Sequence, residues 1–538
     1  MNRALRRRQG KLAKNNRPIP GQPQSPEMLV RLAMACQADG NQGEAEACYE
    51  RAIALRPDYF EALFHLGNLF MMLGRFAEAA QRYRRALQIN PRSVEVLANL
   101  GSAYLKRGQW EDARLSFLRA LEIRPFEPGI LTNLATVQHK MGHGDQAMAT
   151  YDRVLSLVPD FPDALLNRGH VAHEWNRLDE AETSYRRALV VRPDFPEAMT
   201  GLGIVAHKRG QFDSALGWFH SALQRNPNLA TAHYNASLTR LLTGDLAAGW
   251  AQYEWRWLTE EMPPHGFMQP LWGGDVVTGQ TILLHCEQGF GDSIQLIRYA
   301  PVVQVLGMRV AVFCPPPLKR LFATVRGIDH LASASPELPP CHYQAPLMSL
   351  PYLLGSTLAS IPCNTPYLFS EEAKKEYFRE LLAPIVGLKV GLAWSGNPRH
   401  VNDRNRSMDP EIMARLCALS KMNFIPLQKE LSARERAIFS KNANFFDFCR
   451  QLEDFADTAA LVSQLDLVIC VDTAVAHLAG AMAKPGWVLL PKIADWRWLL
   501  DRDDSPWYPS LRVFRQSDDG DWHTVISQVM SVLIHFSL

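Results

Sequence analysis

Three short motifs in the second half of the chain combine small residues with side chains that can bind an anion or accept a proton. The first is the run EQGFGD at residues 287–292. Gly289 and Gly291 allow a tight turn and a close approach of the backbone to a ligand. Asp292 stands where the next helix is expected to begin, so its carboxylate either caps that helix or accepts a proton from a reacting hydroxyl. Ile294 replaces the third glycine of a dinucleotide-binding fingerprint, which argues against an NAD enzyme.

The second motif is WSGNP at residues 394–398, followed by arginines at positions 404 and 406. A strand that ends in a small polar loop with arginines after it suits an anionic ligand, because guanidinium groups form strong charge-assisted hydrogen bonds. The other interpretation is a solvated loop. The residues expected to contact the ligand are Ser395, Gly396, Asn397, Arg404 and Arg406.

The third motif is VDTAVAHLA at residues 471–479, which indicates a strand end, a capping pair and an alanine-rich helix. The free N–H groups and partial positive charge of a helix start make Asp472, Thr473 and Ala474 a candidate diphosphate site. His477 lies one turn into this helix. Its imidazole either reaches the same site or packs against the neighbouring strand.

The segments around these motifs alternate between strands and helices. Buried strands are predicted at 281–286, 309–313, 389–394, 424–427, 465–471 and 488–490, with helices at 292–305 and 521–536. This alternation predicts parallel sheets covered by helices on both faces. Because residues 361–370 contain two prolines and resemble a linker, we expect two Rossmann-like lobes, 280–370 and 371–538. A ligand would then bind in the cleft at the carboxyl ends of the strands.

The first half of the chain is an internal repeat. Prolines recur every 34 residues, at positions 57, 91, 125, 159, 193 and 227. Glycines, alanines and aromatic residues keep the same phase, as expected for paired helices that approach closely and are separated by proline. This pattern resembles the tetratricopeptide repeat. It predicts a solenoid over 26–257, with six full repeats to residue 229, a degenerate capping repeat, and a linker at 258–279.

Four asparagines occupy one position of the first helix of their repeats: Asn99, Asn133, Asn167 and Asn235. In the tetratricopeptide family this helix lines the concave face. An amide both donates and accepts, so such a ladder can hold the backbone of an extended peptide without reading its sequence. The alternative is that these are ordinary asparagines of the repeat.

The composition excludes several classes of protein. A net charge of +2 gives no overall bias toward nucleic acid or membrane. Residues 1–25 are basic and proline-rich, and we expect a disordered tail. No apolar segment has the length of a signal sequence or a membrane span. Nine cysteines without a Cys-x-x-Cys pair argue against a zinc site or a disulfide framework, so a reduced, cytoplasmic protein is expected.

At its three motifs the second half resembles glycosyltransferases of the GT-B fold. It is most similar to the bacterial lipopolysaccharide heptosyltransferases of glycosyltransferase family 9. In that family a Gly-Asp pair opens the first helix and an Asp-[Ser/Thr]-small-x-x-His-Leu-Ala run opens a late one, which residues 291–292 and 472–479 match. The fusion to repeats is similar to the O-linked N-acetylglucosamine transferases and the bacterial flagellin glycosyltransferases. The tryptophan-rich segment 495–516 has no counterpart that we can place.

The resemblance implies an inverting transfer from a nucleotide-sugar donor, with Asp292 as the base that removes the acceptor proton. It implies that the helix start at Asp472–Ala474, with Arg404 or Arg406, stabilises the departing phosphate. Two further residues, just after a second-lobe strand, could touch the nucleotide: Gln428 and Lys429.

The expected fold class is therefore α + α/β, a tetratricopeptide superhelix followed by a GT-B fold. The expected function is transfer of a sugar to a serine or threonine of a protein held by the concave face of the repeats, and the likeness favours flagellin. Two alternatives stay open: a non-catalytic scaffold with a degenerate transferase domain, and a transferase acting on lipopolysaccharide or another glycan. No metal, cofactor or nucleic-acid partner is expected, and Asp501–Asp503 is interpreted as a surface turn.

Overall fold

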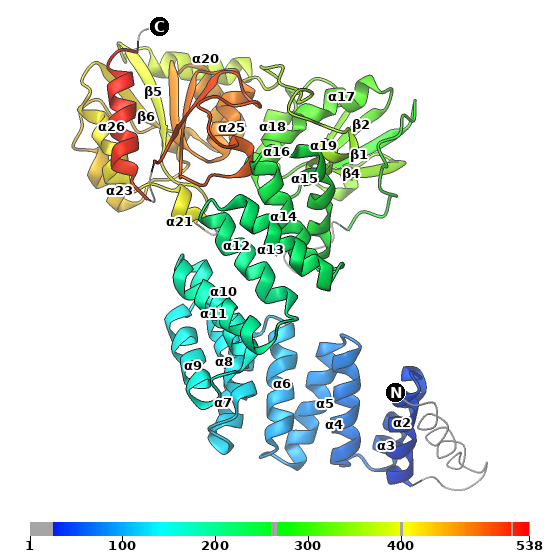
Figure 1. Ribbon diagram of the computed structural model, residues 1–538. Coiled ribbons are helices and arrows are strands. Elements are labelled where there is room, and N and C mark those ends of the chain that lie inside the picture. The colour runs from blue at the N-terminus through cyan, green and yellow to red at the C-terminus, as the bar shows by residue number, and fades with distance from the viewer. Residues whose placement is uncertain (1–24, 260–261, 263–265, 399–401, 518–519, 537–538) are drawn as a thin grey trace. The chain divides into compact units, whose positions relative to one another are not determined.

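A computed structural model of the chain describes residues 25–259, 262, 266–398, 402–517 and 520–536 (Figure 1). The predicted disordered tail therefore lies outside the described residues, apart from Ser25. The chain divides into two compact units between Val205 and Ala206. This division falls inside a helix of the repeat array and not at residue 257, where the sequence placed the end of the solenoid.

The first unit is entirely helical over its described residues, and the predicted all-helical repeat array is confirmed. Each repeat is a pair of antiparallel helices joined by a short turn. Glycines of the first helices let the pairs approach: a Cβ added at Gly67 would lie 2.5 Å from the Tyr83 ring. The helices are α2 (Pro26–Ala38), α3 (Gln42–Leu55), α4 (Phe60–Met72), α5 (Phe76–Ile89), α6 (Val94–Lys106), α7 (Trp110–Ile123), α8 (Pro128–Lys140), α9 (Gly144–Leu157), α10 (Pro162–Glu174), α11 (Leu178–Val191) and most of α12 (Pro196–Lys208).

The second unit begins with the last helices of the array and continues into the α/β region. These helices are α13 (Phe212–Arg225), α14 (Ala230–Leu242), α15 (Leu246–Tyr253) and the 3-10 turn η1 (Glu254–Leu258). Leu241, Leu246 and Trp250 belong to the same hydrophobic core as strand β1 (Thr281–His285). The final repeat is therefore packed against the α/β region as part of one folded body.

The α/β region contains two parallel sheets. The first has the order β3-β2-β1-β4, with β2 (Arg309–Phe313), β3 (His330–Ala332) and β4 (Tyr343–Pro346). The second has the order β6-β5-β7-β8-β9, with β5 (Leu388–Ala393), β6 (Met422–Pro426), β7 (Leu467–Val471), β8 (Gly486–Leu490) and β9 (Leu511–Arg515). β1 and β7 lie inside their sheets and are almost completely buried, as apolar runs flanked by parallel neighbours should be.

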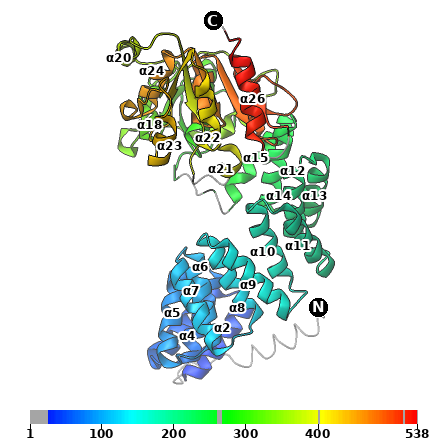
Figure 2. The ribbon, with the colours of Figure 1, turned by 90° about the vertical axis from the view of Figure 1, so that its left-hand side faces the viewer.

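Helices cover both faces of the second sheet. Figure 2 shows α24 (Phe455–Ser463) and α26 (Trp522–Leu533) on opposite sides of it. The remaining helices of the region are α16 (Phe290–Leu296), η2 (Ile297–Tyr299), α17 (Ala300–Val305), α18 (Pro316–Phe322), η3 (Ser335–Glu337), η4 (Leu347–Ser349), α19 (Leu350–Leu353), α20 (Glu372–Leu382), α21 (Asp403–Arg406), α22 (Pro410–Met413), η5 (Ala414–Ala418), α23 (Ala433–Phe439), η6 (Cys449–Gln451), α25 (Ala474–Ala481) and η7 (Trp496–Trp498).

The prediction of one helix over 292–305 is wrong. The helix begins two residues earlier, at Phe290, and the 3-10 turn η2 separates it from α17. Pro301 is the physical reason, because its ring carries no N–H and clashes with the carbonyl four residues before it, in η2. Helix α16 therefore ends at Leu296, where the 3-10 turn η2 begins.

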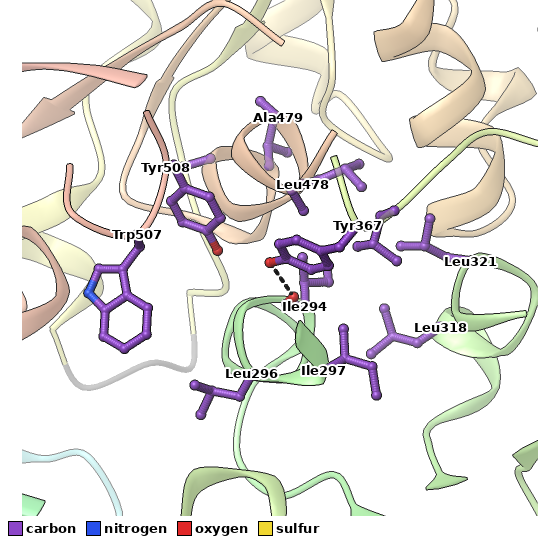
Figure 3. Close-up of a cluster of buried hydrophobic side chains, with 14 of the residues drawn as sticks. Ile294, Leu296, Ile297, Leu318, Leu321, Tyr367, Leu478, Ala479, Trp507 and Tyr508 are labelled. Atoms are coloured by element: carbon purple, nitrogen blue, oxygen red, sulfur yellow. Dashed lines mark hydrogen bonds between the residues drawn. The ribbon is translucent and has the colours of Figure 1, made fainter. Parts of the chain in front are cut away.

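The two lobes meet in a buried cluster (Figure 3). Ile294 and Ile297 of the first lobe and Leu478 of α25 in the second belong to one hydrophobic core. The Tyr367 hydroxyl, on the chain segment between the lobes, donates to the Ile294 carbonyl at 2.9 Å. Arg298, which is buried, donates to that hydroxyl at 2.9 Å and to the Trp507 carbonyl at 2.7 Å. Hydrogen bonds and apolar contacts thus hold the lobes together.

Among the described residues, no helix combines the length and the apolar character that crossing a bilayer would require.

Candidate functional site

The first turns of α16 and α25 lie against each other, although they belong to different lobes. α16 follows strand β1 and α25 follows strand β7, so each starts at the carboxyl end of its sheet. A Cβ added at Gly291 would lie 2.9 Å from His477 Cδ2 and 3.4 Å from Ala474 Cα. Only glycine leaves room for this contact. The structure thus brings the first and third sequence motifs together.

Replacing Gly291 with alanine should push the two helix starts apart, because the new methyl group would collide with the His477 ring. We expect a loss of about 1–3 kcal/mol in the free energy of unfolding, the usual cost of overpacking. Chemical denaturation measures this loss. The matched control is Gly217→Ala in α13, where a Cβ meets nothing within 4 Å. Equal stability of the Gly291 variant and the wild type would contradict the contact.

Asp292 is the third residue of α16. Gly289 is the N-cap residue, and its N–H donates to Asp292 Oδ2 at 2.8 Å. The carboxylate therefore caps the helix from inside its first turn, and not from the N-cap position. Its other oxygen accepts a hydrogen bond from Arg497 Nη2, and the side chain remains 20% exposed. A partly exposed carboxylate can accept a proton from a reacting hydroxyl.

Arg497 comes from η7 of the second lobe and reaches Asp292 of the first. Its Nε donates to Gln295 Oε1 at 2.6 Å, and its Nη1 donates to Asp495 Oδ1 at 2.6 Å. The guanidinium lies 4.1 Å from the centroid of the Trp496 ring, and the side chain is only 8% exposed. Sequence reasoning left this segment unplaced. The available signal was an arginine between two tryptophans, which suits a stacked, buried cation.

The start of α25 carries a buried hydroxyl that has no partner among the described residues. Thr473 is the N-cap residue, and its buried Oγ1 makes no hydrogen bond to any described residue. His477 is buried, shares a hydrogen bond at 3.0 Å between Nδ1 and the Tyr508 hydroxyl, and stacks on Trp498. Burial, with Arg497 nearby, holds the pKa of His477 well below its usual value. The imidazole is therefore neutral at physiological pH and packs within the second lobe.

Asp472 lies just before Thr473 and is buried. Burial, followed by repulsion from Asp495, raises its pKa to about 6, against the opposing effects of Arg497 and Arg406. The folded state therefore binds this proton more tightly than the unfolded chain does. The stability that protonation contributes is complete below about pH 4 and is lost as the pH rises through about 6.

Asp472→Asn should remove this pH-dependent loss of stability, because an asparagine side chain does not titrate. We expect the variant to gain stability relative to the wild type as the pH rises from 5 to 8, by about 1.4 kcal/mol, because pH 5 lies only about one pH unit below the pKa of the wild-type carboxyl. Urea denaturation followed by tryptophan fluorescence at both pH values measures it. A stability difference that is the same at pH 5 and pH 8 would contradict the raised pKa.

The second motif folds into a loop beside Arg406. The Gly396 N–H donates to Ser407 Oγ at 3.1 Å, and a Cβ at Gly396 would lie 2.7 Å from Arg406 Nη2. Asp403 accepts from both Ser407 and Arg406. Arg406 is close enough to Asp472 and to His477 to shift both pKa values. It therefore faces the start of α25.

Other predicted ligand residues lie at different depths. Gln428 Nε2 donates to Ser395 Oγ at 2.6 Å, which joins the ends of β5 and β6. The exposed residues of the predicted set are Gly289, Asn397, Arg404 and Lys429. Arg406 acts electrostatically on Asp472 and lowers its pKa.

The asparagines of the array have different surroundings. Asn99 Nδ2 donates to Asn68 Oδ1 of the preceding repeat at 2.9 Å, and Asn235 Nδ2 donates to the Thr231 carbonyl of its own helix at 2.8 Å. Asn133 and Asn167 are half-buried on α8 and α10. The predicted ladder is thus partly bonded within the array.

No group of three or more histidine, cysteine or carboxylate side chains in the described part of the chain is arranged to hold a metal ion. In the Asp501–Asp503 segment, the aspartates at both ends are exposed. Arg502 Nε, between them, donates to Asp504 Oδ1 at 2.6 Å.

Comparison with known protein families gives different matches for the two halves of the chain. Residues 30–93, 66–128, 132–190 and 174–230 match the tetratricopeptide repeat, and residues 428–489 match glycosyltransferase family 9 (heptosyltransferase). This second match includes Asp472 and His477 but not Asp292. Protein FlbA of Caulobacter vibrioides is 25% identical over 337 residues, which are 58% of this chain and 56% of that protein. The chain thus spans little more than half the length of this relative.

Solved structures of repeat proteins are among those that resemble part of the chain. A tetratricopeptide repeat protein from Parabacteroides merdae is 18% identical, with a TM-score of 0.40, and covers 43% of this chain and 92% of its own. Pseudomonas aeruginosa PilF is 19% identical, with a TM-score of 0.33, and covers 38% and 94%. The family matches place tetratricopeptide repeats in the N-terminal region of the chain and a segment similar to glycosyltransferase family 9 in its C-terminal region.

Proposed function

We propose that this protein is an inverting, metal-independent glycosyltransferase of the GT-B type. It moves a sugar from a nucleotide-sugar donor to a serine or threonine hydroxyl of a protein that the repeats recruit. One observation carries the proposal: Gly291, the neighbour of Asp292, packs against Ala474 and His477 at the start of α25, and the Thr473 hydroxyl at that start has no partner among the described residues. A proton acceptor and an anion-binding helix end therefore share one site.

The reaction that suits this site is a single displacement. The acceptor oxygen attacks the anomeric carbon of the donor as Asp292 takes the hydroxyl proton. A new carbon–oxygen bond forms, and the bond from the anomeric carbon to the phosphate oxygen breaks with its electron pair on the phosphate. The products are the glycoside, a nucleotide anion and a protonated Asp292, which returns its proton to water.

The start of α25 supplies what the departing phosphate needs. Its free N–H groups carry the partial positive charge of the helix, and the Thr473 hydroxyl can donate to a phosphate oxygen. Arg406 adds a full positive charge near Asp472. Such fixed dipoles and cations can do the work that a metal ion does in other transferases.

Arg497 gives the carboxylate its direction. It binds Asp292 while Gln295, Asp495 and the Trp496 ring hold the guanidinium in place. Because the carboxylate is held from two sides, its orientation is fixed before the substrate binds. This lowers the entropic cost of reaching the reactive geometry.

The proposal predicts a covalent mark on other proteins. In cells that carry this gene, an acceptor protein should be heavier by one or more sugar residues than the same protein from cells without the gene. Intact-mass spectrometry of purified candidate acceptors, flagellin first, makes the comparison. Identical masses for every candidate would contradict a protein acceptor.

The repeats should contribute to binding of the acceptor and not to binding of the donor. Replacing Asn133 and Asn167 with alanine removes two amides from neighbouring first helices of the array. We expect the acceptor KM to rise about tenfold, since each lost hydrogen bond costs about 0.5–1.5 kcal/mol. Donor hydrolysis without acceptor should be unchanged. An unchanged acceptor KM would refute recruitment through these amides.

A further inference from the structure

Helix α15, the last helix of the repeat array, contacts the supports of both Asp292 and Arg497. Tyr253, at its end, is bonded to Gln288: Gln288 Nε2 donates to the Tyr253 hydroxyl at 3.0 Å, and that hydroxyl lies 3.2 Å from Gln288 Oε1. Trp250, one turn earlier, packs edge-on against Trp496 with 5.0 Å between ring centroids. Both residues are almost completely buried.

The Tyr253 hydroxyl has a different kind of partner from the hydroxyls of the equivalent tyrosines in earlier repeats. The tyrosines at the equivalent place in earlier repeats bond within their own repeat: Tyr151 pairs with Thr136 at 3.0 Å, and Tyr185 with His173 at 3.1 Å. Tyr253 stands 34-residue multiples after them, at the same position of the repeat. Its hydroxyl instead leaves the array and binds a loop of the α/β region.

That loop aims the candidate base. Gln288 has a φ of 57°, a left-handed conformation that non-glycine side chains rarely adopt. The next residue, Gly289, supplies the N–H that binds Asp292. The two hydrogen bonds to Tyr253 hold Gln288 in this conformation, and thereby fix the turn from which the Asp292 carboxylate projects.

Trp250 supports the other half of the pair. Trp496 lies between the Trp250 ring and the Arg497 guanidinium, 4.1 Å from the latter, and also contacts Trp507. Helix α14 contacts η7 as well. The repeat array therefore provides the surface on which the Arg497-bearing turn rests.

We propose that Trp250 and Tyr253 are positioning residues of the transferase, so that the last repeat is a working part of the catalytic site and not only a cap on the array. This inference rests on the proposed function. Asp292 and Arg497 also act electrostatically on the buried Tyr253 phenol, whose pKa burial raises well above its usual value. All three groups are therefore close together.

Tyr253→Phe tests the inference, because it removes one hydroxyl and keeps the ring. We expect amide hydrogen exchange in residues 286–296 to become about tenfold faster, and kcat for transfer to fall about tenfold through misplacement of the base. The donor KM should stay within about twofold, since the phosphate-binding helix is untouched. Trp250→Phe should act in the same direction.

The matched control is Tyr151→Phe, which removes the equivalent hydroxyl of an earlier repeat. It should change neither the exchange of residues 286–296 nor kcat. The inference is overturned if Tyr253→Phe behaves like this control in the exchange measurement, or if exchange rises while kcat is unchanged. If the wild type turns over no donor, the proposed function fails, and hydrogen exchange alone still decides whether α15 holds the loop.

Discussion

Replacing Asp292 with asparagine is expected to slow sugar transfer about 10²–10⁴-fold, the usual contribution of a positioned base. Asparagine keeps the size of the side chain and one oxygen, so it can still accept from Gly289 or from Arg497. It cannot take the acceptor proton. The donor KM should change little, because the proposed phosphate contacts belong to α25. The measurement is the initial rate of nucleotide release with saturating donor and acceptor.

A second capping aspartate is the control for this substitution. Asp521 caps α26 by accepting from the Thr524 N–H at 3.1 Å and lies on another helix of the second lobe. Asp521→Asn should transfer sugar at the wild-type rate. Thermal unfolding of both variants would show whether helix capping alone explains a lost rate. Transfer by Asp292→Asn within about twofold of the wild type would remove this residue as the base.

Replacing Arg256 with methionine is expected to lower the free energy of unfolding by about 3–5 kcal/mol. Arg256 has a fully buried side chain in η1 and binds Glu254 at 2.6 Å and Glu287 at 2.9 Å. It also donates to Ser349 Oγ at 2.8 Å. Without the guanidinium, the Glu287 carboxyl, which is only 6% exposed, would keep the Met348 N–H as a donor but lose its ion pair, so it would stay buried as an unpaired charge or take up a proton. Urea denaturation followed by tryptophan fluorescence measures the loss.

The control for this substitution is an exposed ion pair of similar geometry. Arg434 binds Asp409 at 2.9 Å with 60% of its side chain exposed, and Arg434→Met should cost less than about 1 kcal/mol. Equal effects of the two substitutions would show that the Arg256 network does not join η1 to the 287–292 loop. Because Glu287 begins that loop, Arg256→Met should also loosen the surroundings of Asp292.

The repeat half of the fold could be predicted from the sequence because its signal is repeated. Six prolines in one phase, with small and aromatic residues between them, define each helix pair locally. The buried strands β1, β5 and β7 could be predicted for a similar reason, since parallel strands inside a sheet are short apolar runs. The local sequence of these segments is enough to predict their secondary structure, without knowing which distant residues they contact.

Three strands were not predicted. β3 is only three residues long, and β4 contains Gln344 and ends at Pro346. β9 is an edge strand in which Arg512 and Arg515 interrupt the apolar pattern. Each is defined by pairing with a strand that is already in place, so the local pattern is too weak to reveal it.

For the candidate site, the sequence indicated which motifs would meet but not what would join them. Gly291, Asp472–Ala474 and His477 come together because both helix starts follow parallel strands. The sequence offered a signal for a stacked, buried cation at Arg497, but the contact of Arg497 with Asp292 could not be foreseen, because it depends on a long irregular segment in which Leu499 and Asp501 both have positive φ. The place of Arg406 likewise depends on the turn of the short helix α21.

The stereochemistry of the product tests the central claim most directly. A single displacement with Asp292 as the base must invert the anomeric carbon, because the acceptor attacks opposite the leaving phosphate. Proton NMR of the transferred sugar gives its anomeric configuration, which is compared with that of the donor. The account predicts opposite configurations in product and donor. The same configuration in both would contradict it, because retention requires a second displacement or a different mechanism.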